Sequence, residues 1–237
     1  MRGRAHRAAG RYGEAERELR LALDGAAGAE RVAVLNELGM TLKYAGRPAE
    51  AASAYREALA LGGPHAADLL HNLGGAAHAA GDHATALRHA REGLDLRVRS
   101  EGEDSIAVAL DRAALAAILI DLGQPAEAAS ILTAVLAAYR RAGEHHETAV
   151  TLHNLGAALY AMGDRDRARI ALREALETKE AVLGPDHPEL AVTLYNLARV
   201  DDAAHLLERC VSVLAGKVAD THPVLAAARR AIAMSGP

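Results

Sequence analysis

Apolar residues in this chain of 237 residues recur every three to four positions, in segments separated by short turns that contain glycine or proline. Apolar residues at this spacing share one face of a helix, so the pattern predicts a series of amphipathic helices. Runs of β-branched residues long enough to form strands are missing. We therefore predict an all-α protein. The predicted helices cover residues 11–24, 30–45, 47–61, 65–80, 82–99, 104–122, 125–142, 146–162, 164–183, 187–215 and 221–234.

The predicted helices follow an internal repeat that is marked by glycines. A glycine at each of these places suits the left-handed conformation that ends a first helix. The next residues suit the start of a second helix, with Asp82 as an N-cap and Pro48 in a first turn. Each repeat is therefore predicted to be a helix, a tight turn and a second helix. The marker glycines are Gly10, Gly46, Gly81, Gly123 and Gly163, at steps of 36, 35, 42 and 40 residues.

The pentapeptide LHNLG occurs at residues 70–74 and 152–156, at the same place in two repeats. The repeats share a register of Leu followed by Gly or Ala, then the turn glycine, an Ala five residues later, and Tyr or Leu beyond. This register resembles the tetratricopeptide repeat. The longer spacing of 40–42 residues, with LGPDHPELAVTLYNLA at residues 183–198, resembles the subtype of kinesin light chains and of sensor arrays in bacterial signalling NTPases. The resemblance implies a right-handed superhelical solenoid of antiparallel helix pairs, in which each repeat packs on its neighbours.

We expect one continuous solenoid rather than two domains. Only nine residues precede Gly10, so the first repeat lacks most of its first helix, and the apolar face of residues 15–23 should be under-covered. One interpretation is a fragment cut from a longer protein, although the opening Met1 also allows a natural start. The solenoid is expected to span residues 1–237, as a partial repeat 1–27, repeats 28–63, 64–102, 103–143 and 144–185, a shortened repeat 186–217, and a terminal helix 221–234.

The shortened repeat lacks its turn glycine. Leu197 and Ala203 are 6 residues apart, whereas the corresponding Leu155 and Ala168 are 13 apart. The missing seven residues equal about two helical turns, so the two helices could fuse into one rod over residues 187–215. The alternative, which we slightly favour, is that a segment after Val200 is absent from the sequence.

Composition excludes several classes of function. The net charge is −4, so no basic face for nucleic acid is expected, and no apolar run is long enough to span a membrane. The N-terminus has no apolar signal region, and the single cysteine, Cys210, fits a reducing compartment. We expect a cytoplasmic protein, and the excess of Arg over Lys suggests a bacterial gene rich in G+C.

The residues offer no motif for catalysis or metal binding. HETAV at residues 146–150 has Val where the second histidine of a zinc signature would stand. His71 lies two helical turns from His78 and two repeats from His153, so these residues cannot share a metal. Cys210 falls in a packing register, and no phosphate-binding or dinucleotide motif exists. We therefore expect no catalytic residue, metal or cofactor.

Polar residues recur on the first helices. Asn appears in mid-helix at positions 72, 154 and 196, although it is a mediocre helix former. The resemblance implies that first helices line a concave groove, where such asparagines hold the backbone of an extended peptide. The alternative is that each Asn bonds a neighbouring helix. The predicted partner-binding residues are Asn36, Lys43, His71, Asn72, His78, His153, Asn154, Tyr160, Tyr195, Asn196 and Arg199.

Three hypotheses follow for function. The first is a non-catalytic array that binds a protein or peptide in its groove. The second is a sensor or regulatory region of a larger bacterial signalling protein, which acts on its own effector domain. The third is self-assembly through the solenoid ends. The last helix would then contribute Val224, Leu225, Ala228 and Ile232.

Overall fold

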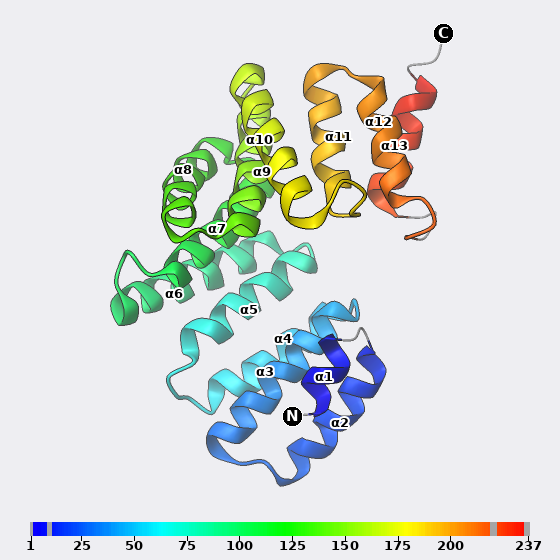
Figure 1. Ribbon diagram of the computed structural model, residues 1–237. Helices are drawn as coiled ribbons and strands as arrows, with labels where there is room; N and C mark the ends of the chain where they lie inside the picture. The colour runs from blue at the N-terminus through cyan, green and yellow to red at the C-terminus, as the bar shows by residue number, and fades with distance from the viewer. Residues whose placement is uncertain (1, 9–10, 219–221, 235–237) are drawn as a thin grey trace. The chain divides into compact units, whose positions relative to one another are not determined.

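A computed structural model of the chain describes residues 2–8, 11–218 and 222–234. These residues form thirteen α-helices and no strand, which confirms the all-α prediction (Figure 1). Gly10, the first marker glycine, lies outside the described residues. The helices are α1 (Arg2–Ala8), α2 (Tyr12–Gly25), α3 (Gly28–Tyr44), α4 (Pro48–Ala60), α5 (Ala66–Ala79), α6 (His83–Glu101), α7 (Ile106–Asp121), α8 (Pro125–Ala142), α9 (His145–Ala161), α10 (Arg165–Leu183), α11 (Leu190–Asp201), α12 (Ala204–Leu214) and α13 (Pro223–Met234).

The helices group into two compact units, Met1–Leu122 and Gly123–Pro237. In unit 1, each helix from α1 to α7 packs against the next, and the first helices α3, α5 and α7 also touch one another in turn. In unit 2, helices α8 to α13 pack in the same sequential way, and α9 touches α11. The single solenoid over residues 1–237 stays a prediction. Among the described residues, no helix is long and apolar enough to cross a membrane.

Turn residues close the helix pairs as the sequence predicts. Gly81 and Gly163 have φ values of 79° and 84°, a region that side chains rarely adopt. After each glycine, an aspartate caps the second helix. Asp82 accepts from the Thr85 amide at 3.1 Å, and Asp164 accepts from the Arg167 amide at 3.2 Å.

The glycine of LHNLG is a packing residue. A Cβ on Gly156 would lie 2.6 Å from the Cγ of Leu172, a residue of the paired helix α10. A Cβ on Gly39, at the same place in an earlier repeat, would lie 2.4 Å from the ring of the buried Tyr55. Large residues of the second helix therefore fill the space that the missing side chains leave, and the two helices approach closely.

The start of the chain differs from the prediction. Residues Arg2–Ala8 form α1, a seven-residue helix that the sequence analysis did not identify. This helix packs on α2, and Ala15 and Leu19 are fully buried. Gly3 of α1 lies so close to Leu19 that a Cβ there would meet its Cγ at 2.6 Å. The prediction of an under-covered face is therefore wrong for Ala15 and Leu19, although Leu21 is 68% exposed.

The predicted rod over residues 187–215 is also wrong. The structure has two helices, α11 and α12, which are separated by Asp202 and Ala203. Asp202 has a φ of 52°, the left-handed conformation that glycine takes at the other turns, and Asp tolerates it better than most residues. The two helices have 12 and 11 residues, against 17 and 19 in α9 and α10. Shorter helices thus flank this turn, which closes over Asp202 and Ala203.

Arginines of α10 hold this glycine-free turn. Arg169 and Arg173 both pair with Asp201, the last residue of α11. Arg165 pairs with Asp202 at 2.8 Å and donates to the backbone oxygen of Val200 at 2.8 Å. The turn therefore has charged contacts where the other repeats have a glycine.

The last helix, α13, is partly buried in the core of unit 2. Leu225 is 1% exposed and Ala228 is fully buried, because α13 packs on α12 and α11. Their assignment to an exposed end face is wrong, since the chain itself covers them. Val224 and Ile232 remain partly exposed.

Candidate functional site

The predicted partner-binding residues all lie on first helices and form one set in each unit. Each of the eleven side chains is at least partly exposed to solvent. This exposure leaves them accessible to a partner. In unit 1, Asn36 and Lys43 lie on α3 and His71, Asn72 and His78 on α5; in unit 2, His153, Asn154 and Tyr160 lie on α9 and Tyr195, Asn196 and Arg199 on α11.

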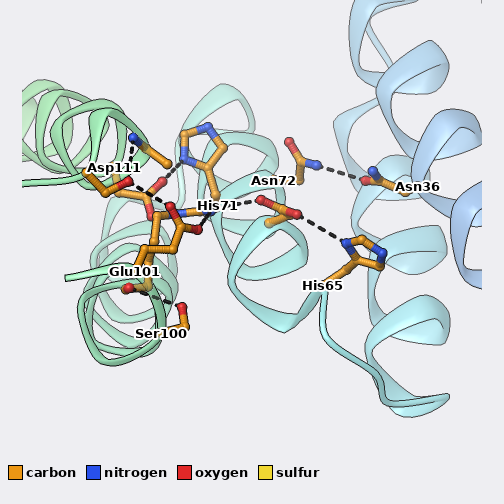
Figure 2. A network of polar contacts seen from close by, with 11 residues as sticks. Asn36, His65, His71, Asn72, Ser100, Glu101 and Asp111 are labelled. Atoms are coloured by element: carbon orange, nitrogen blue, oxygen red, sulfur yellow. Dashed lines mark hydrogen bonds and ion pairs between the residues drawn. The ribbon is translucent and has the colours of Figure 1, made fainter. Parts of the chain in front are cut away.

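Two of the asparagines in unit 1 bind each other. Nδ2 of Asn72 donates to Oδ1 of Asn36 at 2.8 Å, which links α5 to α3 (Figure 2). This is the role within the solenoid that the sequence analysis left open for Asn72. An amide has two N–H donors and a carbonyl acceptor, so the bond uses only part of the capacity of each side chain.

His71 contacts a buried ion pair that Asp111 forms with Arg97. Its Nδ1 lies 2.7 Å from Oδ1 of Asp111 on α7 (Figure 2). Oδ2 of Asp111 accepts from Nε of Arg97 at 2.6 Å. Arg97 also pairs with Asp68 and Glu101. Burial lowers the pKa of Arg97, but hydrogen bonds to Asp68 and Asp111 raise it by more, and the net shift is upward. The guanidinium therefore stays charged inside the unit.

His153 occupies the same place in unit 2 with different partners. Its Nδ1 lies 3.1 Å from Oγ1 of Thr193, and its Nε2 lies 3.4 Å from Nδ2 of Asn196. Nζ of Lys179 donates to the same Thr193 hydroxyl at 3.1 Å and to the backbone oxygen of Glu189 at 3.3 Å. Burial, and then the charge of Lys179, lower the pKa of His153 to about 4. The imidazole is therefore neutral at pH 7.

Arg199 lies against two tyrosine rings of unit 2. Its guanidinium carbon is 5.1 Å from the ring centre of Tyr160 and 5.9 Å from that of Tyr195. Both distances fall within the range of cation–π attraction. Arg199 itself is exposed, so the two rings position a cation at the surface.

Two further predicted residues, Lys43 and Asn154, differ in their surroundings. Nζ of Lys43 lies 5.5 Å from the ring centre of Tyr44, and burial, followed by the charge of Arg7, lowers its pKa. Asn154 makes no side-chain hydrogen bond to any described residue, although it lies in the middle of α9.

The sequence analysis missed two residues beside His78. Nε2 of His78 lies 2.6 Å from Oδ2 of Asp121, and its ring centre lies 5.4 Å from that of His83 in an edge-on contact. The predictions for histidines concern spacings along one helix and between repeats, but not across the turn of a helix pair. The signal was present, because His78 and His83 flank the turn glycine Gly81.

Family models described as the tetratricopeptide repeat match residues 31–99, 65–141 and 148–189. No curated protein matches the sequence.

Solved structures with similar folds are identical to this chain at about a fifth of their aligned positions. BtubC (BKLC) from P. vanneervenii is 22% identical, with a TM-score of 0.65 over 95% of this chain and 90% of that one. The TPR-like repeats of a candidate kinesin light chain from Podosopora anserina are 21% identical, with a TM-score of 0.63 over 79% of this chain and 96% of that one. A Rap protein complexed with Competence and Sporulation Factor is 17% identical, with a TM-score of 0.73 over 86% of this chain and 59% of that one. These structures support the fold, the family models supply the sequence match, and the chain belongs to the tetratricopeptide repeat family.

Proposed function

We propose that this protein binds a partner protein, or an extended peptide segment, through the exposed polar side chains of its first helices, and that it catalyses no reaction. The observation that carries the proposal is Asn154. This amide lies in mid-helix, where Asn costs helix stability, and it has no hydrogen-bond partner among the described residues. Its two donors and its acceptor suit the N–H and C=O groups of a peptide backbone.

Arg199 adds a charge to the proposed surface of unit 2. A guanidinium binds a carboxylate through two parallel hydrogen bonds, and the rings of Tyr160 and Tyr195 reduce the freedom that Arg199 would lose on binding. Together with Asn154, it suits an extended segment that carries an acidic side chain or a C-terminal carboxylate.

Unit 1 offers a pocket to the same kind of ligand. The pocket has a volume of about 90 Å³ and lies between His71 and His78, with Gly74 and Gly75 in its wall. It has room for a small side chain. The amides of Asn36 and Asn72 lie on the same pair of first helices and could hold the backbone beside that side chain.

One similar fold has been crystallised with a factor bound, because the Rap structure is described as complexed with Competence and Sporulation Factor. This likeness supports ligand binding by the present fold. It also favours a second candidate function, the regulatory region of a larger signalling protein, since the match covers 59% of the Rap chain.

Peptides selected from a random-sequence display library on the full chain would test the proposal. The affinity of the selected peptides should fall by about tenfold or more in the Asn154→Ala and Arg199→Ala variants, as expected when a central contact is lost. Glu177→Ala is the matched control, because Glu177 is exposed on the second helix α10 of the same unit. Fluorescence anisotropy gives the affinities, and circular dichroism checks that helicity is unchanged.

Failure to select any peptide, or equal affinity of the parent and both variants, would contradict the proposed surface. Loss of binding in Glu177→Ala alone would move the site to the second helices.

A further inference from the structure

Three side chains from three helices of unit 1 converge at one end of those helices. His78 lies in the last turn of α5, His83 is the first residue of α6, and Asp121 is the last residue of α7. Each offers a metal-binding atom, and the three atoms all lie within 4.8 Å of one another. Nε2 of His78 and Oδ2 of Asp121 lie 2.6 Å apart.

The fold does not require histidine at these places. In the repeat that carries the second LHNLG, 82 residues later, Tyr160 and Arg165 occupy the positions of His78 and His83. In addition, Nδ1 of His83 is buried and has no hydrogen-bond partner in the described part of the chain. A buried ring nitrogen without a partner is costly unless a ligand or an ordered water meets it.

We propose that His78, His83 and Asp121 bind a divalent transition-metal ion, with zinc as the representative. Two imidazoles and one carboxylate form a ligand set that suits zinc and its neighbours, and three protein ligands leave a position for water or a partner residue. Ligand atoms lie about 2.0–2.2 Å from zinc, which places them roughly 3.3–3.6 Å apart in tetrahedral geometry. The separations here, from 2.6 Å up to 4.8 Å, bracket that spacing.

A metal at this place would join two repeats. His78 and His83 belong to the α5–α6 pair, whereas Asp121 ends the first helix of the next repeat. As a hydrogen-bonded pair alone, His78 and Asp121 are 30% and 50% exposed, and such surface pairs stabilise little. Coordination would convert this weak contact into a crosslink between helices. His78 also lines the pocket beside His71, so the ion would lie next to the proposed partner surface.

The test is a zinc titration of the tag-free, chelator-treated full chain, followed by calorimetry in competition with a chelator of known affinity. The parent should bind one ion per chain at this site. Loss of a ligand should weaken binding at least as much as loss of an outer-shell partner does, on the order of 10–100-fold. We expect this loss in His83→Arg, which introduces the residue found at the equivalent position 165, and in Asp121→Asn. The matched control is the double variant His145→Gln and His146→Gln, which removes the adjacent histidines of α9 and should bind as the parent does.

Two further measurements guard against misfolding. Without metal, the melting temperatures of His83→Arg and the parent should agree within a few degrees, and zinc should raise only that of the parent. Bound Co²⁺ should give visible d–d bands in the parent that disappear in His83→Arg. The proposal is overturned if the parent binds no zinc, if either ligand variant keeps the parent's affinity, or if the His145 and His146 variant loses it.

Discussion

The two copies of LHNLG place one histidine in the same position of two repeats and give it opposite electrostatic surroundings. In unit 1, His71 meets the carboxylate of Asp111 40 residues later, and Arg97, 14 residues before Asp111, pairs with it. In unit 2, His153 meets the hydroxyl of Thr193 40 residues later, and Lys179 stands 14 residues before Thr193.

The positions are therefore the same while the chemistry differs. Unit 1 buries a cation together with an anion that neutralises it. Unit 2 buries the cation Lys179 beside a hydroxyl and a backbone carbonyl. His153 is neutral there, because burial and the charge of Lys179 lower its pKa. The repeat fixes where a polar contact forms between neighbouring first and second helices, and a single residue, Asp or Thr, decides whether that contact is ionic.

The largest expected effect comes from removing the carboxylate of unit 1. Arg97 and Asp111 are 7% and 3% exposed, so Asp111→Ala leaves a buried guanidinium without its innermost partner. Loss of one member of a buried ion pair typically costs about 3–5 kcal/mol. The corresponding Thr193→Ala removes a neutral hydrogen-bonding group and should cost about 1–2 kcal/mol. Urea unfolding followed by circular dichroism measures both losses, and equal losses in the two variants would refute the contrast.

Part of this arrangement was predictable and part was not. The repeat register predicts a packing role for the leucine and glycine of LHNLG, because apolar and small residues recur at these places in the repeats and let the paired helices approach closely. The polar partners of the two histidines could not be predicted from recurrence, because Asp111 and Thr193 differ in type. Their common separation of 40 residues from the histidine was the usable signal.

The errors about helices have a different cause. The rod over residues 187–215 was predicted because no glycine follows Leu197, yet Asp202 adopts the left-handed conformation in its place. The local signal is weak, because Asp tolerates the left-handed conformation but also occurs within helices. The contacts from Arg165, Arg169 and Arg173 come from α10, a separate segment, and they stabilise the turn only once the helices pack.

Acid sensitivity provides a second test, and it concerns unit 2. An unfolded histidine has a pKa of about 6.5, whereas burial and Lys179 lower that of His153 to about 4. Between these values the unfolded chain binds a proton that the folded chain does not. Stability should therefore fall as the pH drops from about 6.5 to 4, by at most about 3 kcal/mol, with no such loss above pH 6.5. Urea unfolding of the parent and of His153→Gln across this range measures the loss, which the variant should lack.

Thr193→Asp turns the contact of unit 2 into that of unit 1 and sharpens the same test. A carboxylate within hydrogen-bond distance favours the charged imidazole, so the pKa of His153 should rise by about one unit or more. The acid-induced loss of stability should shrink accordingly. An NMR titration of the imidazole resonances measures this pKa, and an unchanged value would show that Thr193 does not control it.

The smallest expected effect compares the two asparagines of the repeated pentapeptide. Asn72 is bonded to Asn36, so Asn72→Ala breaks one partly buried hydrogen bond and should cost about 1 kcal/mol. Asn154 has no such bond among the described residues, so Asn154→Ala should stay within about 0.5 kcal/mol of the parent. Urea unfolding resolves this difference, with Glu177→Ala as a surface control. If Asn154→Ala were as destabilising as Asn72→Ala, its amide would serve the solenoid rather than a ligand. An unchanged stability, combined with weaker binding of a selected peptide, would instead assign the same residue type an internal role in one unit and a binding role in the other.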